Sequence, residues 1–211
     1  MAKPFLSRLY LVVSEEACVG RDILWVIKQA IKGGVDMVQL REKYLNTHQF
    51  TEVALRLKEM LDGYSVPLII NDNVEVAIQS GAYGIHVGNT DMAPFKVNKL
   101  WPQCNMLGYS VEYIEQLNNE QVQYADYLGI SPVFSTPTKT DTVTEWGLDG
   151  IRQIRNLTDK SLVAIGNMNS NNAFDIISAG ADCLAVVSAI CTANNPAKAA
   201  EAIRNQIEKA L

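Results

Sequence analysis

The chain has 211 residues, a length typical of a single compact domain. Hydrophobic residues make up 48% of the sequence and charged residues only 19%, so the chain can bury a large core and is not expected to be disordered. The formal net charge is -5 and the basic residues form no block, which argues against nucleic acid as a partner.

The four cysteines have no C-x-x-C spacing, and only two histidines are available to complete a zinc site. The sequence also has no secretion signal and no apolar run long enough to span a membrane. We therefore expect one domain over residues 1–211, a cytoplasmic location, reduced thiols and no membrane partner. Whether the chain forms a homo-oligomer is left open by the sequence.

Short β-branched apolar runs alternate with longer segments of helical periodicity along the whole chain. The predicted strands are 9–13, 36–40, 67–70, 84–87, 106–108, 124–130, 161–165 and 183–187. The predicted helices between them are 22–32, 47–61, 74–80, 111–118, 148–157, 171–179 and 196–210. Eight strands that alternate with helices predict a compact α/β fold, the (β/α)8 TIM barrel, because an open flavodoxin-like sheet needs only five strands.

A TIM barrel carries its active site at the carboxyl ends of the strands, where this sequence is rich in polar residues. The second predicted strand ends in the segment Gln39-Leu40-Arg41-Glu42-Lys43. Alternation along a strand sends Gln39, Arg41 and Lys43 to one side, so an amide and two cations should meet at the barrel mouth. This set suits a polyanionic substrate. The alternative is a solvated strand end at which Arg41 pairs with Glu42 or a neighbouring carboxylate.

Two carboxylates follow the third and fourth predicted strands. Asp72 and Asp91 lie 19 residues apart, which is one strand-helix unit, so they should stand side by side. Facing carboxylates repel each other unless a cation or a shared proton lies between them. No histidine or cysteine lies beside them to offer a softer ligand, so the pair favours Mg²⁺, which commonly binds one or two carboxylates together with substrate phosphates. The alternative is that each aspartate is a helix N-cap.

Three further strand ends have the chemistry of a phosphate site. The sixth strand leads into Thr136-Pro137-Thr138-Lys139-Thr140, which gathers hydroxyl donors around one cation. The seventh and eighth strands lead into Gly166 and Ser188, at the position where barrels commonly bind phosphate through backbone N–H groups. A generic surface loop and a tight turn without a ligand are the alternatives.

Seven segments in register, from residue 8 to about 205, together resemble the thiamine-phosphate synthase family. The segments are 39–43, 70–72, 84–91, 108–110, 132–141, 163–166 and 180–188. The resemblance implies a magnesium-dependent transferase that joins 4-amino-2-methyl-5-hydroxymethylpyrimidine diphosphate to 4-methyl-5-(2-phosphoethyl)thiazole or its carboxylated form. The implied products are thiamine phosphate and diphosphate, with the diphosphate leaving before the thiazole nitrogen attacks.

The resemblance also assigns roles to individual residues. Arg41, Lys43 and Lys139 would stabilise the leaving diphosphate, and Asp72 and Asp91 would hold Mg²⁺. The implied pyrimidine diphosphate site contains Gln39, Leu40, Arg41, Glu42, Lys43, Asn71, Ser110 and Lys139. The implied thiazole phosphate site contains Thr136, Pro137, Thr138, Gly166, Val187 and Ser188.

Two other functions are compatible with parts of this pattern. A barrel of the thiazole tautomerase type shares the thiazole phosphate site but needs no diphosphate site, and a non-catalytic sensor of phosphorylated ligands needs no paired aspartates. The sequence departs from the family at Asn167, where a second glycine is more usual, and at residues 142–146, where the family has a smaller stretch containing glycine or proline. These departures bear on the binding of the thiazole.

Overall fold

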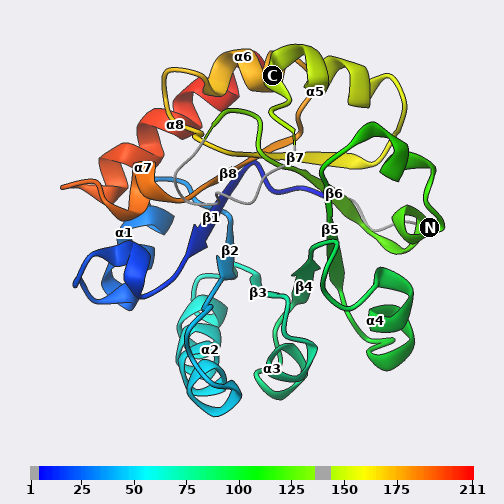
Figure 1. Cartoon of the computed structure of the whole chain (residues 1–211). Helices are drawn as coiled ribbons and strands as arrows, with labels where there is room; N and C mark the ends of the chain where they lie inside the picture. Colours follow the sequence, from blue (N-terminus) through cyan, green and yellow to red (C-terminus); the bar gives the residue numbers. More distant parts are fainter. Residues whose placement is uncertain (1–4, 136–143) are drawn as a thin grey trace.

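The computed structural model describes residues 5–135 and 144–211, and its strands close into a parallel barrel surrounded by helices (Figure 1). Each strand pairs with its neighbour in the chain, and β8 pairs with β1 to complete the ring. The strands are β1 (Leu9–Val13), β2 (Met37–Leu40), β3 (Leu68–Asn71), β4 (Gly84–Val87), β5 (Met106–Val111), β6 (Tyr127–Ile130), β7 (Ser161–Ile165) and β8 (Cys183–Val186). The TIM barrel predicted from the sequence is confirmed.

The helices cover the outside of this ring (Figure 1). They are α1 (Ile23–Lys32), α2 (Thr47–Asp62), α3 (Val74–Gln79), α4 (Pro94–Leu100), α5 (Gly147–Arg155), α6 (Ala173–Ser178), α7 (Ser188–Cys191) and α8 (Pro196–Ala210). Three short 3₁₀ helices are η1 (Glu16–Cys18), η2 (Ile114–Asn118) and η3 (Glu120–Tyr124). Among the described residues, no helix is long and apolar enough to cross a membrane.

The largest differences from the predicted boundaries lie around β5 and β6. The helix predicted over 111–118 begins too early, because β5 continues to Val111, which pairs with Ile130 of β6, and only the 3₁₀ helix η2 follows. The strand predicted to begin at residue 124 starts at Tyr127, because η3 occupies the preceding residues. Two helices were not predicted from the sequence: α4, which begins at a proline, and the single turn α7.

Alternation along the strands divides the buried side chains into two cores. The outward-facing side chains pack against the helices and form the larger core. The inward-facing residues fill the barrel and include Tyr10, Met37, Ile69, Met106 and Tyr127. At the carboxyl ends of several strands, the inward-facing positions are polar. The same alternation therefore determines which side chains reach the barrel mouth.

Aspartates close the amino-terminal end of the barrel. Asp36, just before β2, accepts hydrogen bonds from the backbone N–H groups of Arg8 (3.0 Å) and Leu9 (3.1 Å). Asp182, just before β8, accepts one from the backbone N–H of Leu162 (2.8 Å). These carboxylates satisfy strand N–H groups at the end of the barrel opposite the expected active site, a role in stability.

Candidate active site

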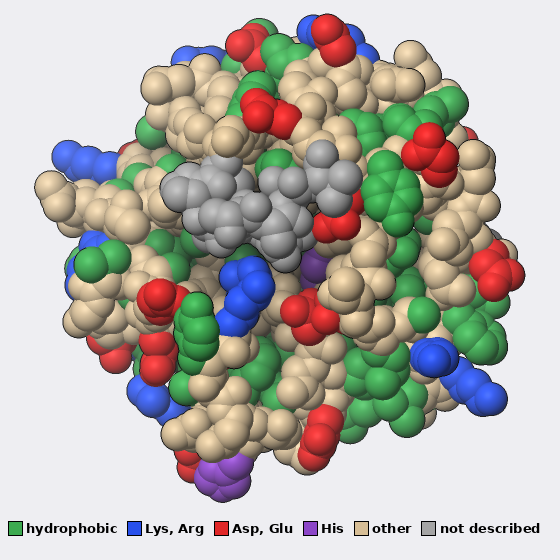
Figure 2. Space-filling view, viewed as in Figure 1, with side chains coloured by type: hydrophobic (Ala, Val, Ile, Leu, Met, Phe, Trp, Pro, Cys, Tyr) green, Lys and Arg blue, Asp and Glu red, His purple; other side chains and the backbone are tan. Residues whose placement is uncertain are grey.

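The carboxyl ends of the strands bring the predicted pyrimidine-site residues to one mouth of the barrel. Gln39 lies two residues after the inward-facing Met37, and Asn71 lies two residues after the inward-facing Ile69. Ser110 continues the inward series of β5 in the same way. Figure 2 shows basic, acidic and histidine side chains meeting at the centre of this face. The structure therefore places these predicted residues at the same end of the barrel.

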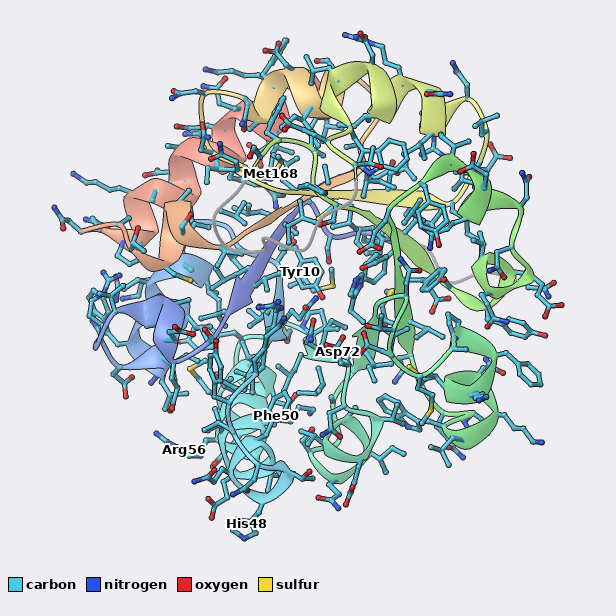
Figure 3. All side chains as sticks on the ribbon, in the orientation of Figure 1. Tyr10, His48, Phe50, Arg56, Asp72 and Met168 are labelled. Carbon is cyan, nitrogen blue, oxygen red and sulfur yellow. The ribbon has the colours of Figure 1, made fainter. Side chains whose placement is uncertain are left out.

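Asp72 and Asp91 form the electrostatic centre of this mouth. Asp72 follows β3 in a left-handed backbone conformation, with φ of 63°, and its N–H donates to the carbonyl of His86 (2.8 Å). Figure 3 shows Asp72 near the barrel axis. Burial, together with the hydrogen bond and negative charge of Asp91, raises the pKa of Asp72 to about 7, while Asn71 and Arg41 act in the opposite direction. The two carboxyl groups are thus close enough to share a proton.

Neither aspartate is a helix N-cap, so that alternative is wrong. Asn73 caps α3, because its side chain accepts a hydrogen bond from the N–H of Val76 (3.0 Å). The N-cap residue of α4 is Ala93, and Asp91 instead accepts from the N–H of Gly88 (2.8 Å). Both carboxylates therefore belong to the strand ends and are available for chemistry at the mouth.

The remaining residues of the 39–43 segment differ in their environments. Arg41 is half-buried and near enough to Asp72 to affect its pKa, and Lys43 is exposed. Leu40 is fully buried in the core between strands and helices, so it faces away from the mouth. Glu42 accepts a hydrogen bond from the backbone N–H of Glu15 (2.7 Å), and burial raises its pKa. Leu40 and Glu42 therefore have structural contacts within the fold. In this segment, the positive charges at the mouth come from Arg41 and Lys43.

A chain of hydrogen-bonded side chains crosses the barrel just below the mouth. Gln39 Nε2 donates to Tyr10 Oη (2.7 Å), and Tyr10 Oη lies 3.1 Å from Tyr127 Oη. Tyr127 Oη lies 3.1 Å from His86 Nδ1, and His86 Nε2 lies 2.9 Å from Ser110 Oγ. His86, Tyr10 and Tyr127 are not among the site residues predicted from the sequence. The inward periodicity of β1 and β6 places both tyrosines inside the barrel, but it does not show that they touch.

The loop after β7 turns through two residues with positive φ, Gly166 and Asn167. Gly166 has φ of 113°, and a Cβ there would lie 2.7 Å from Pro132 Cβ. Asn167 follows with φ of 58°, a left-handed conformation that asparagine tolerates better than most residues. Its carbonyl accepts from the side-chain amides of Asn169 (3.0 Å) and Asn172 (2.9 Å). Asn167 thus supplies the conformation for which the family more often uses glycine.

The end of β8 lies beside this loop in the ring. Val187 packs against the inner core, and Ser188 is exposed at the start of α7. Thr136, Pro137, Thr138 and Lys139 lie outside the described residues. Gly166, Val187 and Ser188 are therefore the part of the predicted thiazole phosphate site that the structure describes.

The donor set at the mouth fits a magnesium ion. Asp72 and Asp91 offer carboxylate oxygens beside each other, and a divalent cation would balance the negative charge that burial and Asp91 disfavour on Asp72. Within residues 5–135 and 144–211, no group of three or more histidine, cysteine, aspartate and glutamate side chains forms a metal cluster.

An open hollow of about 660 Å³ lies beside the mouth, between α3 and α4. It reaches Asp72 at one end, but Val74, Ile78, Met92 and Leu100 make most of the rest of its lining apolar. The hollow is therefore outside the barrel and touches the polar site only at its rim.

Comparison with known proteins assigns the family. Residues 9–190 match the family model described as thiamine monophosphate synthase. A thiamine-phosphate synthase of Albidiferax ferrireducens is 47% identical over 201 residues, covering 95% of this chain and 92% of that protein. The chain belongs to the thiamine monophosphate synthase family. A second thiamine-phosphate synthase of this family, from Leptospira biflexa, is 43% identical and covers 95% of the chain and 98% of its own length.

Solved structures agree with membership of the thiamine monophosphate synthase family. The thiamine phosphate pyrophosphorylase of Pyrococcus furiosus superposes with a TM-score of 0.87 at 29% identity, covering 97% of this chain and 96% of its own. A 3-hexulose-6-phosphate synthase gives a TM-score of 0.69 at 16% identity, with 95% and 99% coverage, and so shares the fold alone.

Proposed function

We propose that this protein is a thiamine-phosphate synthase that joins 4-amino-2-methyl-5-hydroxymethylpyrimidine diphosphate to 4-methyl-5-(2-phosphoethyl)thiazole or its carboxylated form. The products are thiamine phosphate and diphosphate, with CO₂ released when the thiazole is carboxylated. The observation that carries the proposal is the meeting of Asp72, Asp91 and Arg41 at the barrel mouth of a chain that belongs to this family.

The diphosphate end of the site is built from the strands β2 to β4. Asp72 and Asp91 would hold Mg²⁺, which when bound neutralises negative charge on the diphosphate oxygens. Arg41 and Lys43, together with Lys139, supply positive charge to the departing diphosphate. Such preorganised cations stabilise charge that grows in the transition state, so the protein needs no covalent nucleophile for this step.

The rest of the mouth holds the two organic partners. Gln39, Asn71 and Ser110 supply amide and hydroxyl groups that orient the pyrimidine ring. Gly166 lets the backbone approach the thiazole phosphate closely, and Val187 and Ser188 close the other side of that phosphate. A closed pocket protects the pyrimidine-methyl cation from water until the thiazole nitrogen attacks it.

Incubation of the purified protein with both precursors tests this function directly. We expect thiamine phosphate and diphosphate to form in equal amounts with Mg²⁺ present, and product formation to stop when a chelator removes the metal. Undiminished turnover in excess chelator would refute the metal assignment. Isomerisation of the thiazole phosphate without joining would indicate a tautomerase, and binding of both precursors without any turnover would indicate a sensor.

A further inference from the structure

The hydrogen-bonded side chains inside the barrel form a chain whose members come from strands far apart in the sequence. Gln39 from β2, Tyr10 from β1, Tyr127 from β6, His86 from β4 and Ser110 from β5 are joined by four consecutive contacts of 2.7 to 3.1 Å. Its two ends are residues predicted to touch the pyrimidine substrate. Its three middle members have no part in the function proposed above.

The fold makes space for the middle of this chain. Any Cβ at Gly108 would collide with Tyr127 and His86, and a Cβ at Gly129 would lie 2.8 Å from His86 Cε1. The rings of His86 and Tyr127 stack with centroids 5.5 Å apart. Two glycines on neighbouring strands therefore admit one imidazole and one phenol in a fixed arrangement.

Both phenols stay protonated across the working range of pH. Burial is the largest cause of the raised pKa of Tyr10 and of Tyr127. Each phenol therefore always carries one proton, and in a buried site that proton needs an acceptor, because an unpaired buried donor is unfavourable.

Within these four contacts, one direction of donation gives each proton an acceptor. Gln39 Nε2 can only donate, so Tyr10 Oη accepts from it. Tyr127 is the other described partner of Tyr10 Oη, so the Tyr10 proton goes to Tyr127 Oη. Tyr127 must then donate to His86 Nδ1, which places the imidazole proton on Nε2, facing Ser110 Oγ. Ser110 accepts this proton, so its own hydroxyl proton is available to a substrate.

We propose that Tyr10 and Tyr127 are positioning residues of the substrate site, which fix the Gln39 amide at one end and the His86 tautomer at the other. The Gln39 amide nitrogen is held by Tyr10, so its carbonyl oxygen is presented as an acceptor, while Ser110 is presented as a donor. An aminopyrimidine ring, which offers an amino donor beside a ring nitrogen acceptor, matches this pair. The proposal rests on the proposed function for its substrate.

The tautomer of His86 can be measured without any substrate. The chain has only two histidines, and His48 is exposed on α2, so ¹⁵N chemical shifts of labelled imidazoles separate His86 from a solvated reference. We expect His86 to carry its proton on Nε2, and Tyr127→Phe to remove this preference. A matched control is Tyr109→Phe, which removes a buried phenol on the helix side of β5 that donates to Asn89 (2.9 Å), and it should leave the His86 signals unchanged. A proton on Nδ1 in the native protein would overturn the proposal.

Steady-state kinetics test the consequence for the substrate. We expect Tyr10→Phe and Tyr127→Phe each to raise KM for the pyrimidine diphosphate about tenfold, the effect of a lost hydrogen bond worth about 1.4 kcal/mol, with a smaller change in KM for the thiazole phosphate. A merely structural role would lower kcat with both KM values unchanged, and that result would overturn the proposal. If the native enzyme fails to join the two precursors, the proposed function is wrong, whereas the tautomer measurement still decides the role of the tyrosines.

Discussion

Replacing Asp72 by asparagine should stabilise the metal-free protein at neutral and alkaline pH. The pKa of Asp72 rises from an ordinary 3.8 to about 7 because the folded protein buries this carboxyl group beside Asp91. Asparagine keeps the size of the side chain and removes the charge. It also tolerates the left-handed backbone at this position, with φ of 63°, where alanine would add strain of its own.

The sign and size of the effect follow from this pKa. Between about pH 4 and pH 7 the folded protein holds a proton on Asp72 that the unfolded chain has lost, so the free energy of unfolding falls as pH rises. Each unit of pKa difference corresponds to about 1.4 kcal/mol, which gives an upper limit of about 4 kcal/mol above pH 7. For a chain of this length about 1 kcal/mol changes Tm by about 2–4 °C, so the limit corresponds to about 8–16 °C.

Thermal unfolding of the metal-free proteins from about pH 4 to pH 8 provides the assay. The Tm of Asp72→Asn should equal that of the native protein near pH 4 and exceed it increasingly toward pH 8. Mg²⁺ at 100 times its Kd should then stabilise the native protein by about 2.7 kcal/mol but leave Asp72→Asn unchanged. Asp159→Asn, at an exposed position, is the matched control and should show no such pH dependence. A Tm difference that stays constant across this range would refute the reasoning.

Three further substitutions test other parts of the site. Ser188→Ala should raise KM for the thiazole phosphate several-fold, by about 1 kcal/mol, and leave KM for the pyrimidine diphosphate nearly unchanged; equal effects on both would show that the boundary between the two sites is misplaced. Lys139→Ala should lower kcat by about 10²–10³ in single-turnover measurements while weakening pyrimidine diphosphate binding much less, and a loss confined to binding would contradict a role in the transition state. Gly166→Ala should lower the free energy of unfolding in urea more than Gly20→Ala does, because both have positive φ but only Gly166 has a neighbour within 4 Å of the added Cβ; equal losses would mean that backbone strain alone decides the cost.

The barrel was predictable because each strand carries a local signal. The runs at 9–13, 84–87 and 161–165 are apolar, short and bounded by polar or small residues, and they coincide with β1, β4 and β7. The error at residue 124 has a physical reason. The 3₁₀ helix η3 buries Val122 just before β6. Over four or five residues, such a helix has no periodicity that distinguishes it from a strand, so the predicted strand began too early.

The candidate site was predictable only in part, because local sequence signals do not show contacts between distant strands. Asp72 and Asp91 could be paired from the sequence, because consecutive strands of a TIM barrel are neighbours and their ends meet. The contact of Tyr10 with Tyr127 could not, since the two strands are 117 residues apart and meet across the barrel interior. To predict this contact, one must know which residues of every strand face the barrel interior. A sequence pattern gives this register only once the strands are known to form a closed ring.

The two ends of this barrel show how one residue type acquires opposite roles. Asp36, Asp126 and Asp182 precede their strands, and each accepts a hydrogen bond from a backbone N–H of a neighbouring strand; Asp36 and Asp182 also pair with an arginine. Asp72 and Asp91 follow their strands, where the burial and mutual repulsion of the pair leave Asp72 reluctant to ionise. Carboxylates that accept hydrogen bonds from the strands stabilise the fold, whereas carboxylates that the fold places beside each other need a ligand to balance their negative charge. In a parallel barrel, whether an aspartate precedes or follows its strand therefore separates structural from functional positions before any distance is known.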